Sequence, residues 1–157
     1  MKAAPQHLEK IMEKKELKKV CKNHLKFLNG EEEGERADLN GAQLSGIDLG
    51  GVNLKYAHLK KVNLASAELS GADLSDTDLR AANLSGANLH KADLSGADLR
   101  GANLRFASLA GANLTGANLK GADLALFHPE EADYIKAIMP DGKVYDSAVH
   151  NMADFVS

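Results

Sequence analysis

Leucine occurs at every fifth position from Leu39 to Leu124, eighteen times without a gap, and this spacing dominates the chain. A small residue stands two positions before each leucine, alanine in fourteen of the eighteen cases, and aspartate or asparagine separates the two in fourteen cases. Glycine stands two positions after the leucine in ten cases. The repeating unit is therefore Ala-(Asp/Asn)-Leu-X-Gly, and it extends over residues 37–126.

Neither regular element keeps these leucines on one side. In an α-helix, five residues leave each leucine about 140° away from the one before. In a flat strand, an odd period sends successive leucines to opposite faces. The pattern instead predicts a chain that turns a corner once per repeat, near the Gly, Asp and Asn positions, so that every leucine and every small residue points to one common axis. Alanine beside that axis is then a size requirement.

The repeat resembles the unit of the pentapeptide-repeat protein family over residues 37–126, more than half of the chain. The resemblance implies an all-β solenoid, a right-handed quadrilateral β-helix with four repeats per coil and about 4.5–5 coils. It also implies that residues twenty apart stack in register. The family is functionally heterogeneous, so the fold does not fix the role.

Residues 1–36 are predicted to form an amphipathic helical cap followed by an acidic connector, because open ladder edges need protection. One apolar stripe follows helical spacing: Leu17, Val20, Cys21, Leu25 and Leu28. Asn29 and Gly30 signal the end of that helix. An earlier stripe, Leu8, Ile11 and Met12, is out of phase with it and indicates a bend or break between residues 13 and 16.

Residues 127–157 are predicted to form degenerate last repeats, a turn and a short helix that together cap the other end. Counting on in fives gives Pro129, Tyr134 and Met139 as centres. A rival interpretation makes 129–138 a helix, since Pro-Glu-Glu is a good helix start. Pro140-Asp141-Gly142 is a turn signal, and the spacing of apolar residues in 148–156 favours a terminal helix.

Outward positions on one face of the solenoid collect four basic residues directly after leucines: Lys60, Arg80, Arg100 and Lys120. Asp78 and Asp98 precede the two arginines by two positions and are expected to pair with them at the surface. The column is interpreted mainly as a solvated ladder, with a specific anion-binding surface as the alternative. Tyr56 and Phe106 are the large outward side chains, so these six basic and aromatic residues are the candidate interaction surface.

Other chemistry finds little support in the sequence. The Asp and Asn residues before the leucines are predicted to satisfy backbone groups at the corners rather than to bind calcium. The six histidines share no metal-ligand spacing and are interpreted as lone surface residues. We therefore expect no catalytic residues, no cofactor and no metal site, and no enzyme activity.

Net charge and cysteine content restrict the partners and the compartment. The formal net charge of −3 gives no general attraction to nucleic acid or to an anionic membrane. The single cysteine, Cys21, precludes an internal disulfide, and no apolar run approaches the roughly 20 residues of a membrane span. The expectation is a cytoplasmic protein with no signal peptide.

Two functions from different classes fit these observations. The first is a non-catalytic structural or protein-interaction module, a rigid rod that displays side chains to an unknown protein partner, with homodimerisation through the terminal helices as a further expectation. The second is implied by the family resemblance: a DNA-mimicking modulator of a type II topoisomerase such as gyrase. The second needs a strongly negative rod, whereas the repeats carry nine acidic and eight basic residues.

Overall fold

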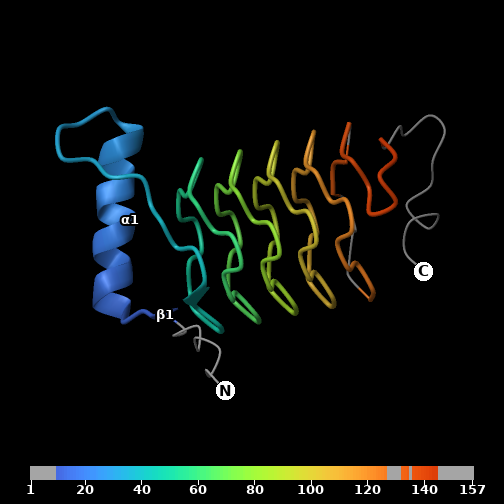
Figure 1. Ribbon diagram of the computed structural model, residues 1–157, viewed down its shortest axis with the longest axis horizontal. Helices are drawn as coiled ribbons and strands as arrows, with labels where there is room; N and C mark the ends of the chain where they lie inside the picture. Colours follow the sequence, from blue (N-terminus) through green and yellow to red (C-terminus); the bar gives the residue numbers. More distant parts are fainter. Residues whose placement is uncertain (1–9, 127–131, 135, 145–157) are drawn as a thin grey trace, which may run out of the picture.

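The computed structural model describes residues 10–126, 132–134 and 136–144. Its helix is α1 (Lys14–Leu28), and its two short strands are β1 (Lys10–Ile11) and β2 (Ala42–Gln43). The other described residues wind into a stack of similar turns, with α1 lying across the end of the stack that contains the earliest repeats (Figure 1).

The repeats stack in register at steps of twenty residues. Parallel β-bridges join Asp38 to His58, and bridges of the same step recur up to the pair Asn118 and Ile138. From Leu39 to Leu104, each central leucine donates its N–H to a carbonyl of the next turn, as from Leu39 to His58 at 2.8 Å. From the second turn on, residues before the leucines donate back to the preceding turn, as from Asn63 to Ala42 at 2.9 Å. Since twenty residues hold four repeats, each turn has four sides, as the family resemblance implies.

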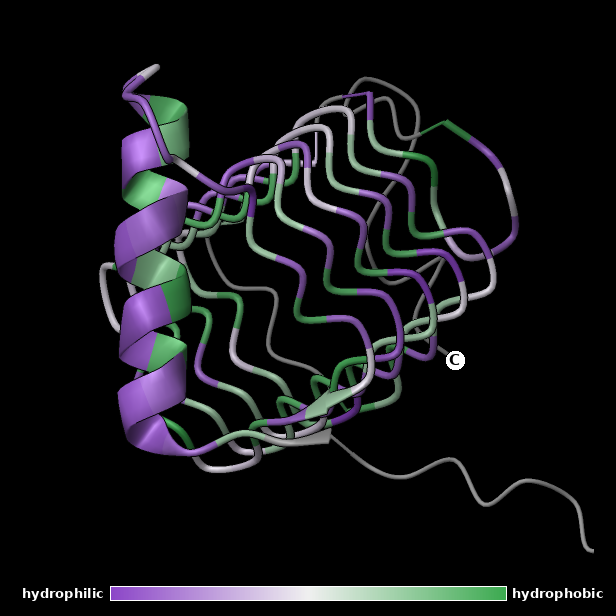
Figure 2. Cartoon of the chain, turned by 60° about the vertical axis from the view of Figure 1, so that its left-hand side comes forward, coloured by the Kyte–Doolittle hydropathy of each residue, from purple (hydrophilic) through white to green (hydrophobic). Residues whose placement is uncertain are grey.

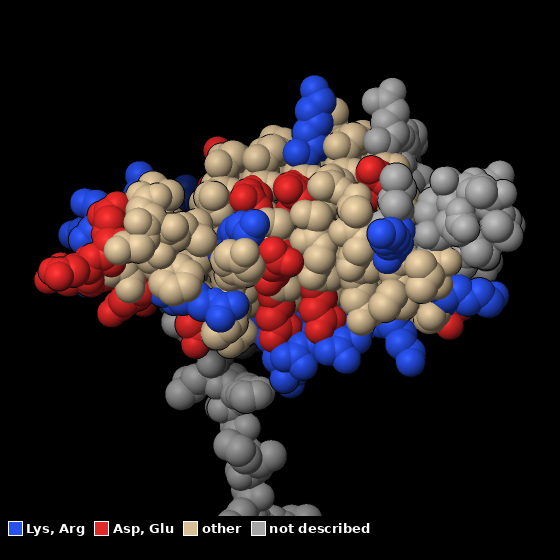
Figure 3. Space-filling view, turned by 90° about the horizontal axis from the view of Figure 1, so that it is seen from above, with Lys and Arg blue, Asp and Glu red and all other residues tan. Residues whose placement is uncertain are grey.

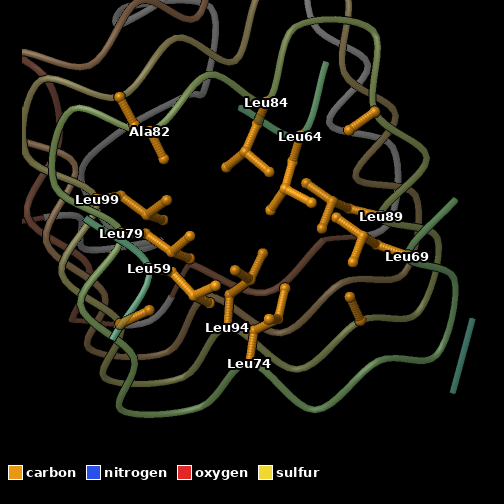
Figure 4. Packing of buried hydrophobic residues seen from close by; sticks show 14 of the residues in the cluster. Leu59, Leu64, Leu69, Leu74, Leu79, Ala82, Leu84, Leu89, Leu94 and Leu99 are labelled. Carbon is orange, nitrogen blue, oxygen red and sulfur yellow. The ribbon is translucent and has the colours of Figure 1, made fainter. Parts of the chain in front are cut away.

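The interior consists of columns of leucine beside columns of alanine. The eighteen central leucines are all at most 8% exposed. Figure 4 shows four such columns pointing into one shared space, for example Leu59, Leu79 and Leu99 in one and Leu74 and Leu94 in another. The larger Ile47 and Val52, which replace alanine in the first turn, are only partly buried and pack against this core. Alanine is thus the usual residue beside the axis, although Val62 and Thr77 are also fully buried inside the stack, at 0% and 1% exposure.

The corners are formed by the second residue after each leucine. That residue has a positive φ whether it is glycine, as in Gly101 at 67°, or not, as in Ala81 at 56°. Positive φ strains residues that have a Cβ, which explains why glycine recurs at this position. The Asp or Asn before each leucine lies in the bridged ladder and not at a corner. The prediction that corners fall near glycine was therefore correct, and the prediction that they also fall near these Asp and Asn residues was wrong.

The N-terminal region is helical where the second apolar stripe predicts it and differs before that point. α1 begins after Glu13 and ends at Asn29, as expected, and Leu17 is 4% exposed. Leu25, however, is 50% exposed. The earlier stripe was wrong as a helix, because Lys10–Ile11 is a strand that pairs in parallel with Ala42–Gln43. Leu8 lies outside the described residues.

Beyond Leu126 the ladder continues in frame. Asp133 bridges to Asn113, Ile138 bridges to Asn118, and the predicted centres Tyr134 and Met139 are buried. These contacts favour the in-frame interpretation, and residues 132–134 and 136–138 contain no helix. The predicted turn is present, since Gly142 N–H donates to Met139 C=O at 2.8 Å with a φ of 86°. Pro129 and the predicted helix in 148–156 lie outside the described residues.

Seen partly along the stack, the turns enclose a narrow four-sided core (Figure 2). Hydrophobic and hydrophilic residues alternate at short intervals along each turn, and the hydrophilic side of α1 faces away from the stack. The surface available for function therefore comes from the outward positions, the corners and the two ends.

Candidate functional site

The four predicted basic side chains lie along one side of the stack, and we call them the basic column: Lys60, Arg80, Arg100 and Lys120. They share a side because the residues two positions before them are joined by bridges of twenty residues: His58, Asp78, Asp98 and Asn118. Arg80 is partly exposed and the other three are exposed. The structure therefore brings the column together as the sequence predicts.

Both arginines of the basic column are held by carboxylates. Arg80 donates from Nε to Asp78 Oδ1 at 2.7 Å and from Nη2 to Oδ2 at 2.6 Å, a bidentate pair. Arg100 makes the same pair with Asp98, at 2.8 and 2.7 Å. Arg80 Nε also lies 3.7 Å from Asp98 Oδ2, which links the two pairs. The predicted ion pairs are present, and they compensate the two arginine charges.

These pairs change the acidity of the carboxyl groups. Hydrogen bonds from Arg80 lower the pKa of Asp78, against the opposing effect of partial burial, and Arg100 lowers the pKa of Asp98 in the same way. Surface ion pairs of this kind contribute about 0–1 kcal/mol each. Their main effect is to give one side of the ladder ordered, ionised side chains whose net charge is close to zero.

The free positive charge of the basic column lies at its two ends. Among the described residues, Lys60 and Lys120 make no ion pair. Figure 3 shows acidic side chains lying directly beside basic ones on the face in view. The column is thus a weaker anion-binding surface than four adjacent cations would be.

Three large hydrophobic side chains occupy corner positions and point outward. Tyr56, Phe106 and Leu126 are 42%, 55% and 61% exposed, with φ values of 63°, 58° and 58°. Tyr56 is fifty residues, or two and a half coils, before Phe106. Tyr56 therefore lies at the corner opposite the one that Phe106 and Leu126 share. The structure therefore does not join the two predicted aromatics into one patch.

Phe106 and Leu126 are stacked neighbours, and with Arg105 and Asp123 they form what we call the Phe106 corner. Phe106 N–H donates to Ala125 C=O at 3.3 Å, which places the next turn directly beside it. The Arg105 guanidinium lies 5.7 Å from the centre of the Phe106 ring and 3.3 Å from Asp123 Oδ2. Leu126 was missed in the sequence, although its distance of twenty residues from Phe106 is a usable signal.

Tyr56 lies beside the junction between the helix and the first turn. The Lys55 ammonium is 5.0 Å from the centre of its ring and 3.8 Å from Asp76 Oδ2. The Tyr56 carbonyl accepts a hydrogen bond from Arg36 Nε. The backbone of Tyr56 thus has a structural role, while its ring stays exposed.

The polar residues before the leucines bond to the backbone, as predicted. Asp48 Oδ1 accepts from the N–H of Gly50 at 3.1 Å, and Asn83 Oδ1 accepts from that of Ser85 at 3.2 Å. On one side the amides also bond to one another from turn to turn, as from Asn83 Nδ2 to Asn63 Oδ1 at 3.3 Å. Within the described residues, no group of three or more His, Cys, Asp or Glu side chains is placed to hold a metal ion.

His24 corrects the interpretation of the histidines as surface residues. It is 0% exposed and lies between α1 and the first turn. Its Nε2 bonds the carbonyl of Lys55 at 3.0 Å, and its Nδ1 accepts from the N–H of Ala37 at 3.1 Å. Burial lowers the pKa of His24, and nearby Arg36 acts in the same direction, while hydrogen bonds to backbone carbonyls oppose them. The neutral imidazole therefore ties α1 to the stack.

Comparisons with known proteins agree with this geometry. A family model described as pentapeptide repeats matches residues 35–67, 57–96 and 97–125, in eight copies. No curated protein sequence matches the chain. The crystal structure of a pentapeptide-repeat protein, Rfr23 from the cyanobacterium Cyanothece 51142, has a TM-score of 0.67 and 33% identity, covering 80% of this chain and 99% of that one.

Two further solved structures are more distant. HetL from the cyanobacterium Nostoc sp. strain PCC 7120, a pentapeptide-repeat protein involved in heterocyst differentiation regulation, is 38% identical over 71% of this chain and 56% of its own, with a TM-score of 0.40. QnrB1, a plasmid-mediated fluoroquinolone resistance protein, is 20% identical over 68% of this chain and 60% of its own, also with a TM-score of 0.40.

In the part of the chain that the structure describes, no helix is long and apolar enough to cross a bilayer.

Proposed function

Because the chain belongs to the pentapeptide-repeat family, whose members fold as right-handed quadrilateral β-helices, we propose that it is a non-catalytic interaction module that presents outward side chains to a protein partner. Proteins of this family are generally structural or interaction modules. The ladder and the buried leucine columns make a rigid platform, so bound partners do not need to order it.

The observation that carries the proposal is the choice of residue at the corners. A positive φ strains any residue with a Cβ by roughly 1–2 kcal/mol, and glycine avoids this strain. Between residues 37 and 126, eight corners have a non-glycine residue with this strain, among them Lys61, Asp76 and Ala81, so the strain alone does not mark a site. Phe106 and Leu126 differ from most of the others because they are large and hydrophobic and expose more than half of their side chains.

The Phe106 corner has the composition of a binding hot spot. Aromatic residues and arginine dominate the binding energy of protein interfaces. Phe106 and Leu126 supply the apolar centre, while Arg105 and Asp123 supply a polar rim whose charges already pair. We propose this corner as the main contact, with Tyr56 and the basic column as secondary candidates.

Affinity capture from a lysate of the source organism tests the proposal, with bound proteins identified by mass spectrometry. The test variant combines Phe106→Asn with Leu126→Gly, because asparagine and glycine both tolerate a positive φ. We expect it to lose a partner that the wild-type protein retains, while its thermal stability stays equal or rises. Tyr56→Asn is the matched control, since it removes an exposed aromatic from the opposite corner.

The outcomes distinguish the candidate surfaces. Equal capture by the wild type and the Phe106→Asn, Leu126→Gly variant would reject the Phe106 corner. Loss with Arg80→Glu and Arg100→Glu would move the contact to the basic column. Loss with Tyr56→Asn alone would move it to the junction with α1.

We do not favour the alternative of DNA mimicry of a type II topoisomerase substrate. Mimicry of a duplex needs a run of uncompensated negative charge, whereas Asp78 and Asp98 are bonded to arginines and Asp123 pairs with Arg105. A gyrase supercoiling assay is the direct test. Inhibition or protection by micromolar protein would revive this alternative.

We also propose that α1 is the N-terminal cap of the solenoid and that the protein works in the cytoplasm. The cap is supported by the burial of Leu17 and by the hydrogen bond between His24 and the first turn.

The cytoplasmic location is supported by the presence of a single cysteine, because one cysteine cannot form an internal disulfide and the reducing cytoplasm is then the expected compartment.

A further inference from the structure

The first turn of the stack has a backbone edge that only part of the chain covers. Inside the stack, the residue before each leucine donates its N–H to the preceding turn, as Glu68 donates to Ile47 C=O at 2.8 Å. In return, its carbonyl accepts an N–H from the preceding turn, as Glu68 C=O accepts from Leu49. In the first turn no earlier repeat exists. β1 pairs with this edge at Ala42–Gln43, and His24 bonds it at Lys55.

The side between those two contacts is open. For Asp48 N–H, Asp48 C=O and Gly50 C=O, no hydrogen bond exists within the described part of the chain. β1 runs parallel to the first turn and would reach this side next, but the chain leaves the ladder path after β1 and enters α1. The backbone edge at residues 48–50 can therefore pair with a further strand, just beyond the point where the pairing with β1 ends.

A groove lies along this open edge. Its volume is about 580 Å³, within the range of ligand-binding clefts. One wall is the first turn, from Gly46 to Val52, and the other is α1 with its side chains Lys14, Leu17, Lys18 and Cys21. The apolar Ile47 and Val52 are partly exposed in it.

The charge around the groove selects the occupant. Lys14 and Lys18 are exposed at the rim, one turn of α1 apart, and they outnumber the one carboxylate that lines the groove, Asp48, whose Oδ1 accepts from the N–H of Gly50. An entering segment therefore meets unpaired backbone groups, an apolar floor and two cations beside a single anion. Exposed strand edges bind extended peptides by adding a strand, with pockets for alternate side chains.

We propose that this groove binds an extended segment of a partner protein, with aliphatic side chains that face the first turn and acidic side chains that face Lys14 and Lys18, in parallel register with residues 48–50. This interaction surface goes beyond the proposed function, since it uses the end of the solenoid and not the Phe106 corner.

The test uses a fluorescein-labelled hexapeptide of alternating valine and aspartate with the full-length protein, followed by fluorescence anisotropy. Two control peptides separate the contributions: one has lysine in place of aspartate, and one has N-methylated valines that cannot donate to the edge. We expect binding of the first peptide and at least about tenfold weaker binding of both controls.

Protein variants locate the site. Lys14→Glu with Lys18→Glu is expected to weaken binding by about tenfold or more, because two attractive contacts become repulsive. Lys15→Glu with Lys22→Glu is the matched control, since it makes the same change in net charge with residues that do not line the groove. Bound peptide should also slow the reaction of Cys21, the single cysteine, with a maleimide.

Several results would overturn the proposal: equal binding of the N-methylated peptide, equal losses in the two lysine pairs, unchanged Cys21 reactivity, or no binding at about 1 mM peptide. If deletion of residues 1–9 is required for binding, the groove belongs to the chain's own N-terminus. The Phe106→Asn, Leu126→Gly variant should bind the peptide normally, so failure here does not bear on the Phe106 corner.

Discussion

The glycines at the corners show how one backbone angle fixes the choice of residue. A Cβ built on Gly101 would meet no atom within 4 Å, so only the φ of 67° selects glycine there. The same is true of Gly41 and Gly121. Steric crowding is excluded at these positions, and substitutions there measure backbone strain alone.

Gly101→Ala should lower the free energy of unfolding by about 1 kcal/mol, and Gly101→Val should lower it by more, because β-branched residues adopt positive φ least readily. Urea denaturation measures both. The reverse change, Ala81→Gly, is the control and should leave the protein at least as stable. Equal stability of wild type and Gly101→Ala would show that the corners are not strained.

Gly34 has the opposite reason for being glycine. A Cβ there would lie 2.6 Å from the backbone of Lys26 and Phe27. Gly34→Ala should therefore loosen the contact between the connector and the end of α1. Hydrogen exchange of α1 amides should become faster in this variant, whereas Gly41→Ala, in open space, should leave α1 protection unchanged.

Inside the stack the same reasoning concerns volume. Leu94→Ala should cost about 2–5 kcal/mol and Ala97→Leu about 1–3 kcal/mol, since both positions are fully buried. Ser95→Ala, at a partly exposed outward position, is the control and should change stability by no more than about 0.5 kcal/mol. If Ala97→Leu were as mild as Ser95→Ala, the core would have unused space.

At the scale of elements, α1 depends on a buried histidine. The pKa of His24 is lowered in the folded protein, chiefly by burial, whereas an unfolded histidine titrates near 6.5. The neutral form is favoured by folding, so this contribution to stability is complete above about pH 6.5 and is lost as the pH falls through the lowered folded-state pKa.

Thermal melts or α1 hydrogen exchange between about pH 5 and 8 should show α1 loosening at the acidic end. His24→Gln should remove this pH dependence, because an amide can bond the same groups without titrating in the range. A His24→Gln protein that keeps the wild-type pH profile would assign the effect to another group.

The helix and β1 show where sequence periodicity stops being informative. The buried side of α1 is the narrow stripe Leu17, Val20, Cys21 and His24, while Leu25 is exposed. His24 lies seven residues after Leu17, so the helical period did place it on the inner side, but its polar character hid this. β1 has two residues and no period at all. Its pairing depends on the edge of the first turn, which exists only after the stack has formed.

For the whole molecule, the five-residue period predicted inward columns of leucine and alanine and a corner in each repeat, while the family resemblance supplied the four repeats per coil. Together they gave the stacking of residues twenty apart and the pairing of Asp78 and Asp98 with arginines. The separation of Tyr56 from Phe106 and the stacking of Phe106 on Leu126 also follow from the same count. The groove beside α1 was not predictable, because it depends on how a helix settles on the end of the stack.

The capping role of α1 is tested by association of whole molecules. Leu17→Asp places a carboxylate in a side chain position that is 4% exposed and should detach α1, so that the freed ladder edge promotes concentration-dependent self-association in light scattering. Leu25→Asp, on the same helix but 50% exposed, should behave as the wild type. If both variants match the wild type, the first turn does not need α1 for protection.

The twenty-residue coil also restricts how such a chain can change in length. Gain or loss of one pentapeptide would rotate everything downstream by a quarter turn relative to α1, and would move Phe106 and Leu126 to a different corner while leaving the buried columns intact. A change of four pentapeptides would lengthen the rod and keep every surface aligned. If a functional surface extends over several coils, selection should favour duplications in multiples of twenty residues. The fold itself would tolerate duplications in multiples of five residues.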